Sequence, residues 1–212
     1  MNPAVHAFDA PSFELPLFPL QSVLFPGGLL GLKVFEARYL DLVGRCLRES
    51  EPFGVVALKS GSEVKGGSNT AERLETIGCL AELIDVDGDQ PGILQVRCRG
   101  TQRFSIAQLR QEPNHLWVAE ARLLAADEPA LPSEELTGSA RGLANAIATL
   151  KQQGSTPFLE PYRFDDAGWL ANRWCEILPI PLAAKQKLME LPDALVRLKL
   201  VDDFLRSKGV VA

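Results

Sequence analysis

The sequence predicts an α+β fold, with a small β-barrel over residues 1–125 followed by a small helical bundle over residues 126–212. Short apolar runs separated by glycine, proline and aspartate turns fill the first part, which is typical of strands. Apolar residues recur every three or four positions in the second part, which is typical of amphipathic helices. The pattern changes at Ala125–Pro132, so we expect two subdomains there.

The first predicted strands lie on either side of a Gly-Gly turn. Leu15–Leu20 is apolar but contains Pro16 and Pro19, which cannot donate hydrogen bonds to a β-ladder. We therefore expect this segment to be extended and to lie at a sheet edge. Leu29–Phe35, after the turn, is expected to be a more regular strand.

A short helix is predicted at Glu36–Arg48. Leu40, Val43 and Leu47 recur at helical spacing, which is typical of a helix. Glu36 lies at the amino end, where the helix dipole favours an acidic side chain.

Further strands are expected wherever short apolar runs lie between turn residues. These runs are Phe53–Leu58, Thr76–Asp85, Ile93–Gly100, Arg103–Ile106 and Leu116–Leu124. Between the second and third of them, D-V-D-G-D-Q-P-G predicts a hairpin, because Asp-Gly and Pro-Gly pairs favour turns. A turn centred between Gly88 and Asp89 would place Cys79 opposite Cys98.

The segment Ser60–Ser68 is rich in glycine and serine, so we expect a loop with little order near Gly66 and Gly67. Its spacing partly fits the phosphate loop G-x-x-x-x-G-K-S/T. Gly67 stands where that loop has the lysine that holds the phosphates, so the sequence favours a flexible loop over a nucleotide site.

The second part of the chain predicts helices with clear boundaries. One stripe carries Leu136, Ala140, Leu143, Ala144, Ile147 and Leu150. Gly154 is the expected end of this helix. Asp165 or Asp166 is expected to cap a second helix that contains Trp169 and Trp174. These two tryptophans are five residues apart and do not share one stripe, which leaves open whether one of them is exposed to a partner.

Two shorter helices are expected near the carboxyl end. Leu182–Leu191 follows Pro179–Pro181, and Asp193 is expected to cap the last helix. Its predicted core row is Leu195, Leu198, Val201 and Leu205, and the side chains predicted to face water are Lys199, Asp202 and Asp203.

Charge argues against a polyanion-binding protein. The formal net charge is −5, with 12 Lys/Arg against 15 Asp/Glu in residues 1–125 and 10 against 12 in residues 126–212. Nucleic-acid binding depends on clustered basic residues that neutralise phosphates. We therefore expect no nucleic-acid partner.

The cysteines and the amino-terminal sequence indicate a cytoplasmic protein. Cys46, Cys79, Cys98 and Cys175 show no C-x-x-C spacing and are expected to be buried thiols. The first residues lack the basic and apolar regions of a secretory signal, and no run of about 18 apolar residues is present. We expect no membrane association.

We expect no metal ion and no cofactor. Asp85–Asp89 resembles part of a calcium loop, but Gln90 and Val96 occupy the positions that need Gly and Glu. The only two histidines, His6 and His115, are not paired with cysteine at zinc-ligand spacing.

No catalytic residue is expected either. The sequence contains no G-x-S-x-G motif, and His115 lies in a predicted surface turn. A Ser-Lys pair could be built from Lys185 or Lys187 with Ser133 or Ser139, but helical spacing gives no reason for such a contact.

Several short motifs resemble the amino-terminal domain of Lon protease, in the same order and from about Leu15 to about Lys208. They are P-L-F-P-L at Pro16–Leu20, F-P-G-G at Phe25–Gly28, F-E-A-R-Y at Phe35–Tyr39, I-G-C-L-A-E-L at Ile77–Leu83, R-G-T-Q-R-F at Arg99–Phe104 and L-P-I-P-L-A-A-K-Q-K-L-M-E-L-P-D at Leu178–Asp193. The first three motifs most resemble those of proteins that carry this domain alone.

This resemblance implies a PUA-like β-barrel followed by a helical bundle. In Lon, the domain helps to recognise damaged or unfolded polypeptides and precedes an ATPase module and a Ser-Lys protease module. Neither module is expected within these 212 residues. The resemblance therefore implies a non-enzymatic module that binds unfolded or apolar polypeptide segments in protein quality control.

The candidate polypeptide-binding residues are Glu36, Arg38, Tyr39, Arg99 and Arg103. We expect them to lie along an apolar groove between barrel and bundle, with the arginines at its polar rim. Capping and packing is the alternative role for the first three. For Arg99, which shares a strand face with Arg97, the alternative is a solvated surface with local ion pairs.

Two other functions are compatible with the predicted architecture. The same groove could hold a small molecule or serve a hydrolytic reaction, although the sequence nominates no catalytic residues for it. RNA binding is suggested only by the use of PUA-like folds elsewhere, and the acidic balance argues against it.

Overall fold

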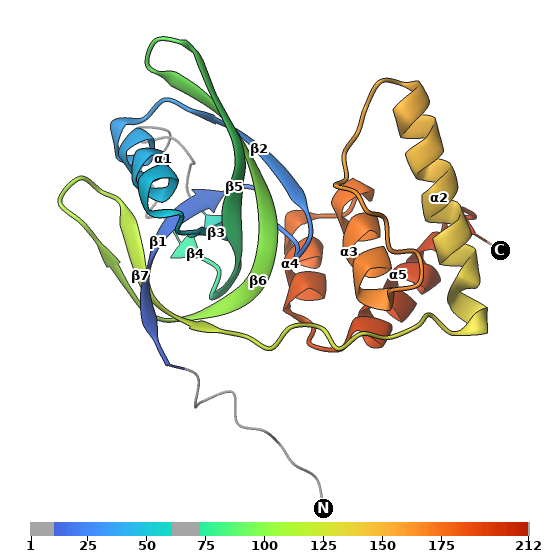
Figure 1. Ribbon diagram of the computed structural model, residues 1–212. Helices are drawn as coiled ribbons and strands as arrows, with labels where there is room; N and C mark the ends of the chain where they lie inside the picture. The colour runs from blue at the N-terminus through green and yellow to red at the C-terminus, as the bar shows by residue number, and fades with distance from the viewer. Residues whose placement is uncertain (1–10, 61–72, 212) are drawn as a thin grey trace, which may run out of the picture. The chain divides into compact units, whose positions relative to one another are not determined.

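The computed structural model in Figure 1 describes residues 11–60 and 73–211. The chain divides into two compact units. One comprises the residues up to Leu24 together with Leu30–Ala126, and the other comprises Phe25–Leu29 and everything from Asp127 onward. The expected glycine-rich loop at 61–68, its low order and His6 all lie outside the described residues.

The first unit contains a seven-stranded sheet and a single helix among the described residues. They are β1 (Phe13–Leu20), β2 (Leu29–Val34), α1 (Ala37–Glu49), β3 (Phe53–Ser60), β4 (Arg73–Leu74), β5 (Ile77–Gln90), β6 (Ile93–Gln111) and β7 (Trp117–Leu123). The main strand order is β1-β7-β6-β5-β3-β4, and β3 also pairs with β1. This last pairing closes the sheet into a ring (Figure 1), which confirms the predicted barrel.

The prediction that β1 is an edge strand is wrong. Its residues 13–17 pair antiparallel with β7, and its residues 17–20 pair in parallel with β3. Pro16 lies in the first stretch and Pro19 in the second, so each proline sits where β1 is paired along one side only. The missing N–H groups are therefore compatible with a strand that joins two neighbours.

The β5–β6 hairpin is confirmed, but its turn lies later than expected. Gln90 pairs with Ile93, and Gly92 between them has a φ of +76°, which suits glycine. As a result, Cys98 lies opposite Leu83 and not opposite Cys79. Strand β6 also continues without a break to Gln111, so the two strands predicted at Ile93–Gly100 and Arg103–Ile106 are one.

Helix α1 forms where predicted. Its buried side chains include Tyr39, Leu42, Val43 and Cys46, whereas Leu47 is 51% exposed. Of the three apolar positions whose spacing predicted the helix, Val43 is fully buried and Leu40 is partly buried against the core, so Leu47 alone lies on the exposed side. The buried face joins the core cluster formed by residues of β1, β2, β3, β5 and β6.

The second unit is helical. Its elements are the 3₁₀ turn η1 (Glu134–Leu136) and the helices α2 (Thr137–Gln152), α3 (Ala167–Ile177), α4 (Leu182–Glu190) and α5 (Ala194–Ser207). Asp166 caps α3 by accepting a hydrogen bond from the Trp169 amide at 3.0 Å. Asp193 caps α5, and Gly154 after α2 has a φ of +79°. The predicted helices are therefore confirmed, boundaries included, to within a few residues.

Both tryptophans of α3 are buried, each only 4% exposed, so neither is available to a partner on this surface. Trp169 packs edge-on against Phe158 and Phe164. Trp174 donates its indole N–H to the Ser139 carbonyl at 3.0 Å. Helix α3 is thus buried on more than one stripe, which explains why a single-stripe argument could not place them.

The predicted outward face of α5 is partly wrong. Asp202 is 3% exposed and accepts hydrogen bonds from the Ser139 hydroxyl at 2.5 Å and from Arg206 at 2.6 Å. Leu195, predicted to face the core, is 40% exposed. A polar side chain with hydrogen-bond partners is thus buried inside this unit, and the spacing of apolar residues cannot reveal such a position.

A buried ion pair holds the Phe25–Leu29 segment against α3. Arg173, whose side chain is fully buried, binds both carboxylate oxygens of Glu176, at 2.8 and 2.6 Å. It also donates to the Pro26 carbonyl at 3.1 Å. A Cβ at Gly28 would collide with the Glu176 carboxylate, so the Gly-Gly turn allows close approach to this pair.

We predict a pH dependence of stability from Glu176. Burial raises its pKa to about 7 from an ordinary value of 4.5, although Arg173 opposes the rise. The folded chain thus binds a proton at Glu176 more tightly than the unfolded chain does. Protonation of Glu176 therefore stabilises the folded chain; this stabilisation is fully present below pH 4.5 and is lost as pH rises through 7. From pH 5 to 8, the free energy of unfolding should fall by on the order of 2 kcal/mol more than in Glu176→Gln.

Urea unfolding of both proteins at each pH measures the difference. Equal pH slopes in the wild type and Glu176→Gln would contradict a raised pKa. The slope is the relevant quantity, because the variant also leaves Arg173 without its counter-charge and is expected to be less stable at every pH.

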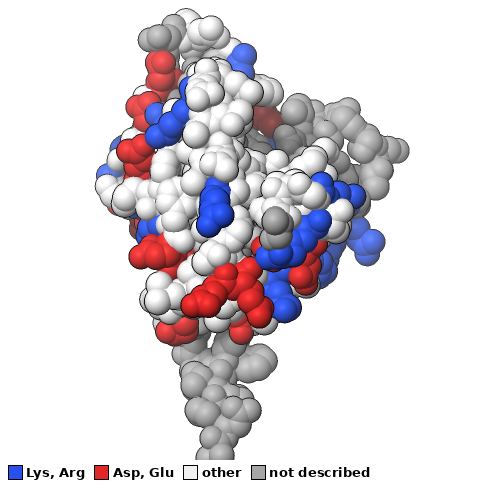
Figure 2. All heavy atoms as spheres, turned by 90° about the vertical axis from the view of Figure 1, so that its right-hand side faces the viewer, with Lys and Arg blue, Asp and Glu red and all other residues white. Residues whose placement is uncertain are grey.

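Figure 2 shows one face of the second unit, where acidic and basic side chains lie next to each other, with uncharged surface between these groups.

Among the helices in residues 11–60 and 73–211, none combines the length and the apolar composition that a membrane span needs. All four cysteines are buried thiols outside any disulfide bond, as predicted.

Candidate functional site

A hollow of the first unit with a largely apolar lining lies between β1, β2 and the start of α1, with a volume of about 430 Å³. We call it the β1–β2 groove. Its apolar lining comes chiefly from Phe18 and Leu20 of β1, Leu32 and Val34 of β2, and Phe35 and Tyr39 at the start of α1. A groove with this lining suits aliphatic or aromatic side chains of a ligand.

Stacked aromatic rings fix part of the groove wall. The rings of Phe18 and Tyr39 lie 4.0 Å apart and nearly parallel, and both residues are buried. Phe35 is different, because 51% of it is exposed. A half-exposed phenylalanine beside buried aromatic rings offers an apolar contact surface to a ligand.

The polar groups beside the groove are already bonded to each other. Glu36 lines the groove and forms an ion pair with Arg38 at 3.0 Å. Arg38 is 7% exposed, donates to the His115 carbonyl at 2.8 Å and lies 4.6 Å from the Tyr39 ring centre. This arginine therefore supports Tyr39 and the turn that contains His115. His115 is itself exposed, as predicted.

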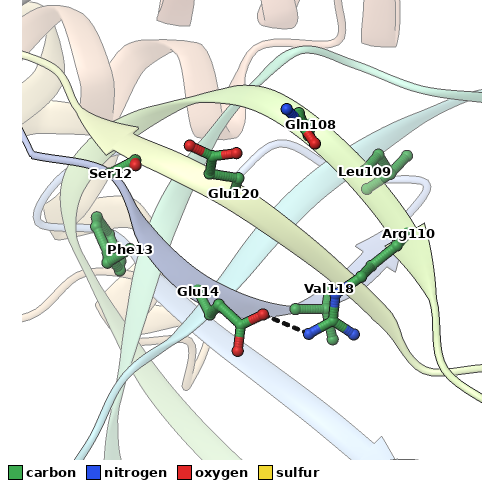
Figure 3. Close-up of a pocket in the computed structure, with 8 residues that line it drawn as sticks. All are labelled: Ser12, Phe13, Glu14, Gln108, Leu109, Arg110, Val118 and Glu120. Atoms are coloured by element: carbon green, nitrogen blue, oxygen red, sulfur yellow. Dashed lines mark hydrogen bonds and ion pairs between the residues drawn. The ribbon is translucent and has the colours of Figure 1, made fainter.

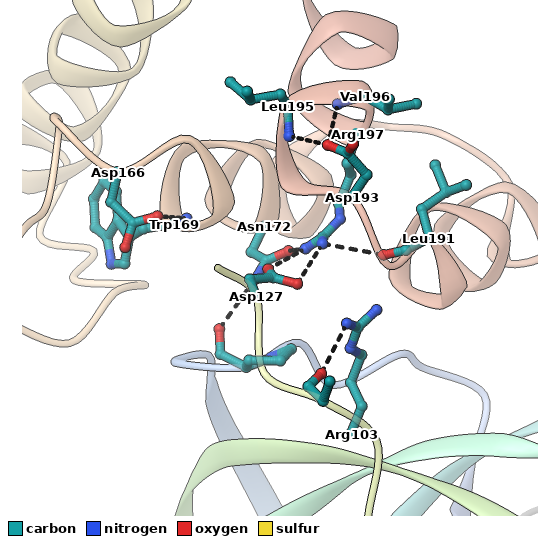
Figure 4. Close-up of polar contacts among 12 residues, drawn as sticks. Arg103, Asp127, Asp166, Trp169, Asn172, Leu191, Asp193, Leu195, Val196 and Arg197 are labelled. Atoms are coloured by element: carbon teal, nitrogen blue, oxygen red, sulfur yellow. Dashed lines mark hydrogen bonds and ion pairs between the residues drawn. The ribbon is translucent and has the colours of Figure 1, made fainter. Parts of the chain in front are cut away.

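The structure separates the five residues predicted as a binding site. Glu36 and Tyr39 line the β1–β2 groove. Arg99 lies on the exposed face of β6 and pairs with Glu82 at 2.7 Å, which matches the alternative of local ion pairs. Arg103 is 4% exposed and donates to the Ala125 carbonyl at 3.3 Å (Figure 4).

Sequence reasoning missed most of the groove residues. A strand was predicted at Leu29–Phe35, but the alternation of Leu30, Leu32 and Val34 within it was not used to assign an apolar face. Nothing in the sequence indicated that this strand and β1 would line the same groove.

Two other hollows are lined by many charged residues. One, of about 360 Å³, lies over β1, β6 and β7, where Arg110 forms an ion pair with Glu14 at 2.5 Å (Figure 3). Glu14 lies directly opposite Glu120 across the strands. The other, of about 440 Å³, lies among η1, α2 and the end of α5. Neither offers a continuous apolar lining.

A buried polar cluster in the second unit is structural. The Arg197 guanidinium binds both carboxylate oxygens of Asp127 at 2.8 Å, the Asn172 side-chain oxygen at 2.7 Å and the Leu191 carbonyl at 3.2 Å (Figure 4). Arg197 is fully buried. The cluster joins α3, α5 and the chain entering this unit.

The groups considered for nucleophilic chemistry are otherwise engaged. Burial raises the pKa of both Cys98 and Cys175 to about 12, so these thiols stay protonated near neutral pH. Lys185 donates to the Glu176 carbonyl at 3.0 Å, and Ser139 donates to Asp202. Within the part of the chain that the structure describes, no group of three or more His, Cys, Asp or Glu side chains could hold a metal ion.

Comparison with protein families finds one that spans nearly the whole chain. Residues 14–207 match the model described as the ATP-dependent protease La (LON) substrate-binding domain. This range contains every residue of the β1–β2 groove.

Curated relatives are Lon proteases of low sequence identity. The chain is 26% identical to the Lon protease of Anaeromyxobacter dehalogenans, 28% to Lon protease 2 of Myxococcus xanthus and 24% to the Lon protease of Escherichia coli K12. Each match covers 92% of this chain but only 23 to 25% of the relative. The chain thus spans about a quarter of the length of these relatives.

Solved structures support the same fold. A crystal structure of a Lon N-terminal domain protein from Xanthomonas campestris aligns with a TM-score of 0.71 at 31% identity, covering 89% of this chain and 96% of that one. The N-terminal domain of a Mycobacterium avium complex Lon protease aligns with a TM-score of 0.60 at 16% identity, covering 90% and 97%.

Proposed function

Because the chain belongs to the family of ATP-dependent protease La (Lon) substrate-binding domains, we propose that it binds unfolded polypeptides through apolar segments that enter the β1–β2 groove. The observation that carries this proposal is the exposed Phe35 beside the stacked Phe18 and Tyr39. The role of such binding is protein quality control.

The groove gives a physical basis for selecting unfolded chains. Folded proteins bury most of their large aliphatic and aromatic side chains, whereas unfolded chains expose them. Transfer of one such side chain from water into an apolar site contributes about 1.5–3 kcal/mol. The groove therefore binds large apolar side chains, which native proteins bury, and this binding needs no particular sequence.

In this proposal, binding requires no ATP and leaves the polypeptide intact. The matched family is a substrate-binding domain, and the relatives' remaining three quarters have no counterpart in the matched region. The lining of the groove, largely aliphatic and aromatic, is suited to holding a chain.

The proposal predicts that Phe35→Asp weakens binding of an unfolded polypeptide at least tenfold, because a carboxylate replaces an apolar contact at the groove. The probe is a small disulfide protein kept unfolded by reduction and alkylation, labelled for fluorescence anisotropy, with its native form as a reference. Leu47→Asp is the matched control, since Leu47 is also 51% exposed and lies on α1 but does not line the groove.

The wild type and Leu47→Asp should bind the unfolded form alike and largely ignore the native form. Equal loss of binding in both variants would indicate that apolar exposure in general, and not the groove, accounts for binding. Failure of the wild type to distinguish unfolded from native probe would refute the proposed function itself.

A further inference from the structure

Within residues 11–60 and 73–211, each strand that lines the β1–β2 groove has a stretch that is paired along one side only. Strand β1 pairs with β7 only through Leu17, so Phe18 to Leu20 have β3 on one side and, within the described residues, no strand on the other. Strand β2 pairs with β6 and, within the same residues, with no second strand. Two incompletely paired strands thus line one groove.

The groove reaches the main chain of β2 as well as its side chains. Five consecutive β2 residues, 30–34, line it, although neighbouring side chains of a strand point to opposite faces. A Cβ placed on Gly31 would meet nothing within 4 Å, so the sheet face at this residue is open. Because no strand within the described residues pairs with the second edge of β2, the backbone N–H and C=O groups of that edge are available to a ligand in the groove.

An open strand edge can accept another strand. Its unpaired N–H and C=O groups match those of any extended chain, whatever the sequence of that chain. Strand β2 has six residues, which at about 3.3 Å per residue gives an edge of roughly 20 Å. This length suits an extended segment of five or six residues.

We propose that a polypeptide binds the β1–β2 groove as an added β-strand, hydrogen-bonded to the free edge of β2. Its alternate apolar side chains pack against Phe18, Tyr39 and Phe35. The occupant is an extended segment of an unfolded chain with apolar residues at every second position and no proline. This inference rests on the proposed function and specifies the conformation in which the substrate is bound.

A second copy of the chain fits this edge less well. Lys33 is exposed on β2, and pairing two β2 edges would bring two lysines to one small interface. Charged residues, lysine in particular, commonly protect edge strands against such self-pairing. Among the groove-lining residues only Lys33 and Glu36 are charged, and Glu36 is paired with Arg38, so the groove does not select by charge.

The test uses an eight-residue peptide in which valine and threonine alternate, and two versions of it methylated at the odd or the even amide nitrogens. Methylation removes N–H donors from one edge of the peptide strand and leaves every side chain in place. Each lost hydrogen bond costs about 0.5–1.5 kcal/mol, so two or three lost bonds should weaken binding at least tenfold. We expect this loss for one methylated version and less than a twofold change for the other.

Hydrogen exchange of the protein gives a second readout. Binding of the unmethylated peptide should slow exchange at alternate amides within residues 30–34, which side-chain docking alone would not do. Gly31→Val should leave the fold intact, because a Cβ at this position meets open space, and should weaken peptide binding, because Gly31 lines the groove and a branched side chain would fill part of it.

Three outcomes would overturn strand addition. Equal effects of the two methylated versions would show docking through side chains alone. Failure of the unmethylated peptide to bind, while the reduced and alkylated protein binds in a Phe35-dependent manner, would show another bound conformation. A dimer that dissociates when the peptide is added would assign the edge to a second copy. In the first two cases the proposed function stands, and its own failure is recognised separately with the Phe35→Asp and Leu47→Asp pair.

Discussion

Replacing Asp127 with asparagine is expected to lower the free energy of unfolding by about 3–5 kcal/mol. Arg197 is fully buried, and Asp127 binds its guanidinium through both carboxylate oxygens at 2.8 Å. Asparagine keeps the shape but removes the negative charge and one acceptor. The guanidinium then stays buried without the Asp127 carboxylate, beside neutral oxygens such as those of Asn172 and Leu191.

Urea unfolding followed by tryptophan fluorescence measures the loss, because Trp169 and Trp174 are buried in the same unit as Asp127. Glu82→Gln is the matched control. It removes the same charge from the Glu82–Arg99 pair, whose side chains are 46% and 55% exposed, and should cost less than about 1 kcal/mol. Similar losses in the two variants would show that burial does not make the Asp127 pair important.

Pairs of this kind could not be predicted from the sequence. Asp127 and Arg197 are 70 residues apart, and charged residues on a helix usually face water. The same assumption led to the prediction that Asp202 faces water. In the structure, Asp202 is buried and accepts hydrogen bonds from Ser139 and Arg206. A buried charge becomes visible only when its distant partner is known.

Locally determined features were predictable. The aspartate caps at Asp166 and Asp193 and the glycine after α2 act on neighbouring residues, so helix boundaries followed from the sequence. The role of β1 depends on its parallel pairing with β3, between segments more than 30 residues apart. Two prolines favoured an edge, and only the ring closure shows how β1 accommodates them.

The candidate site divides along the same line. Glu36 and Tyr39 were found through a motif that resembles the family's, and both line the groove. Arg38 and Arg103 belong to the same motifs, but their guanidinium groups bind backbone carbonyls, a role that residue type cannot reveal. Phe18 lies on β1 and was missed. The groove forms between β1 and β2, and the sequence does not show that these two strands lie beside each other.

Replacing Gly78 with alanine is expected to destabilise the barrel by about 3 kcal/mol. Gly78 lies in β5 directly opposite Phe104, whose ring would be 2.6 Å from an added Cβ. The same Cβ would collide with the Val55 carbonyl of β3. Phe104 is fully buried and the closed ring fixes both strands, so the contact cannot relax by moving a flexible side chain.

Gly31→Ala provides the control, since it makes the same change in a strand of the same sheet where a Cβ meets open space. It should leave stability unchanged or raise it by up to about 1 kcal/mol, because alanine restricts the unfolded chain. Urea unfolding measures the free energy of unfolding of both variants, and so compares a Cβ added at a crowded position with one added at an open position. A loss at Gly31 as large as that at Gly78 would mean that the space over this face of β2 is filled, and would contradict an open groove at Gly31.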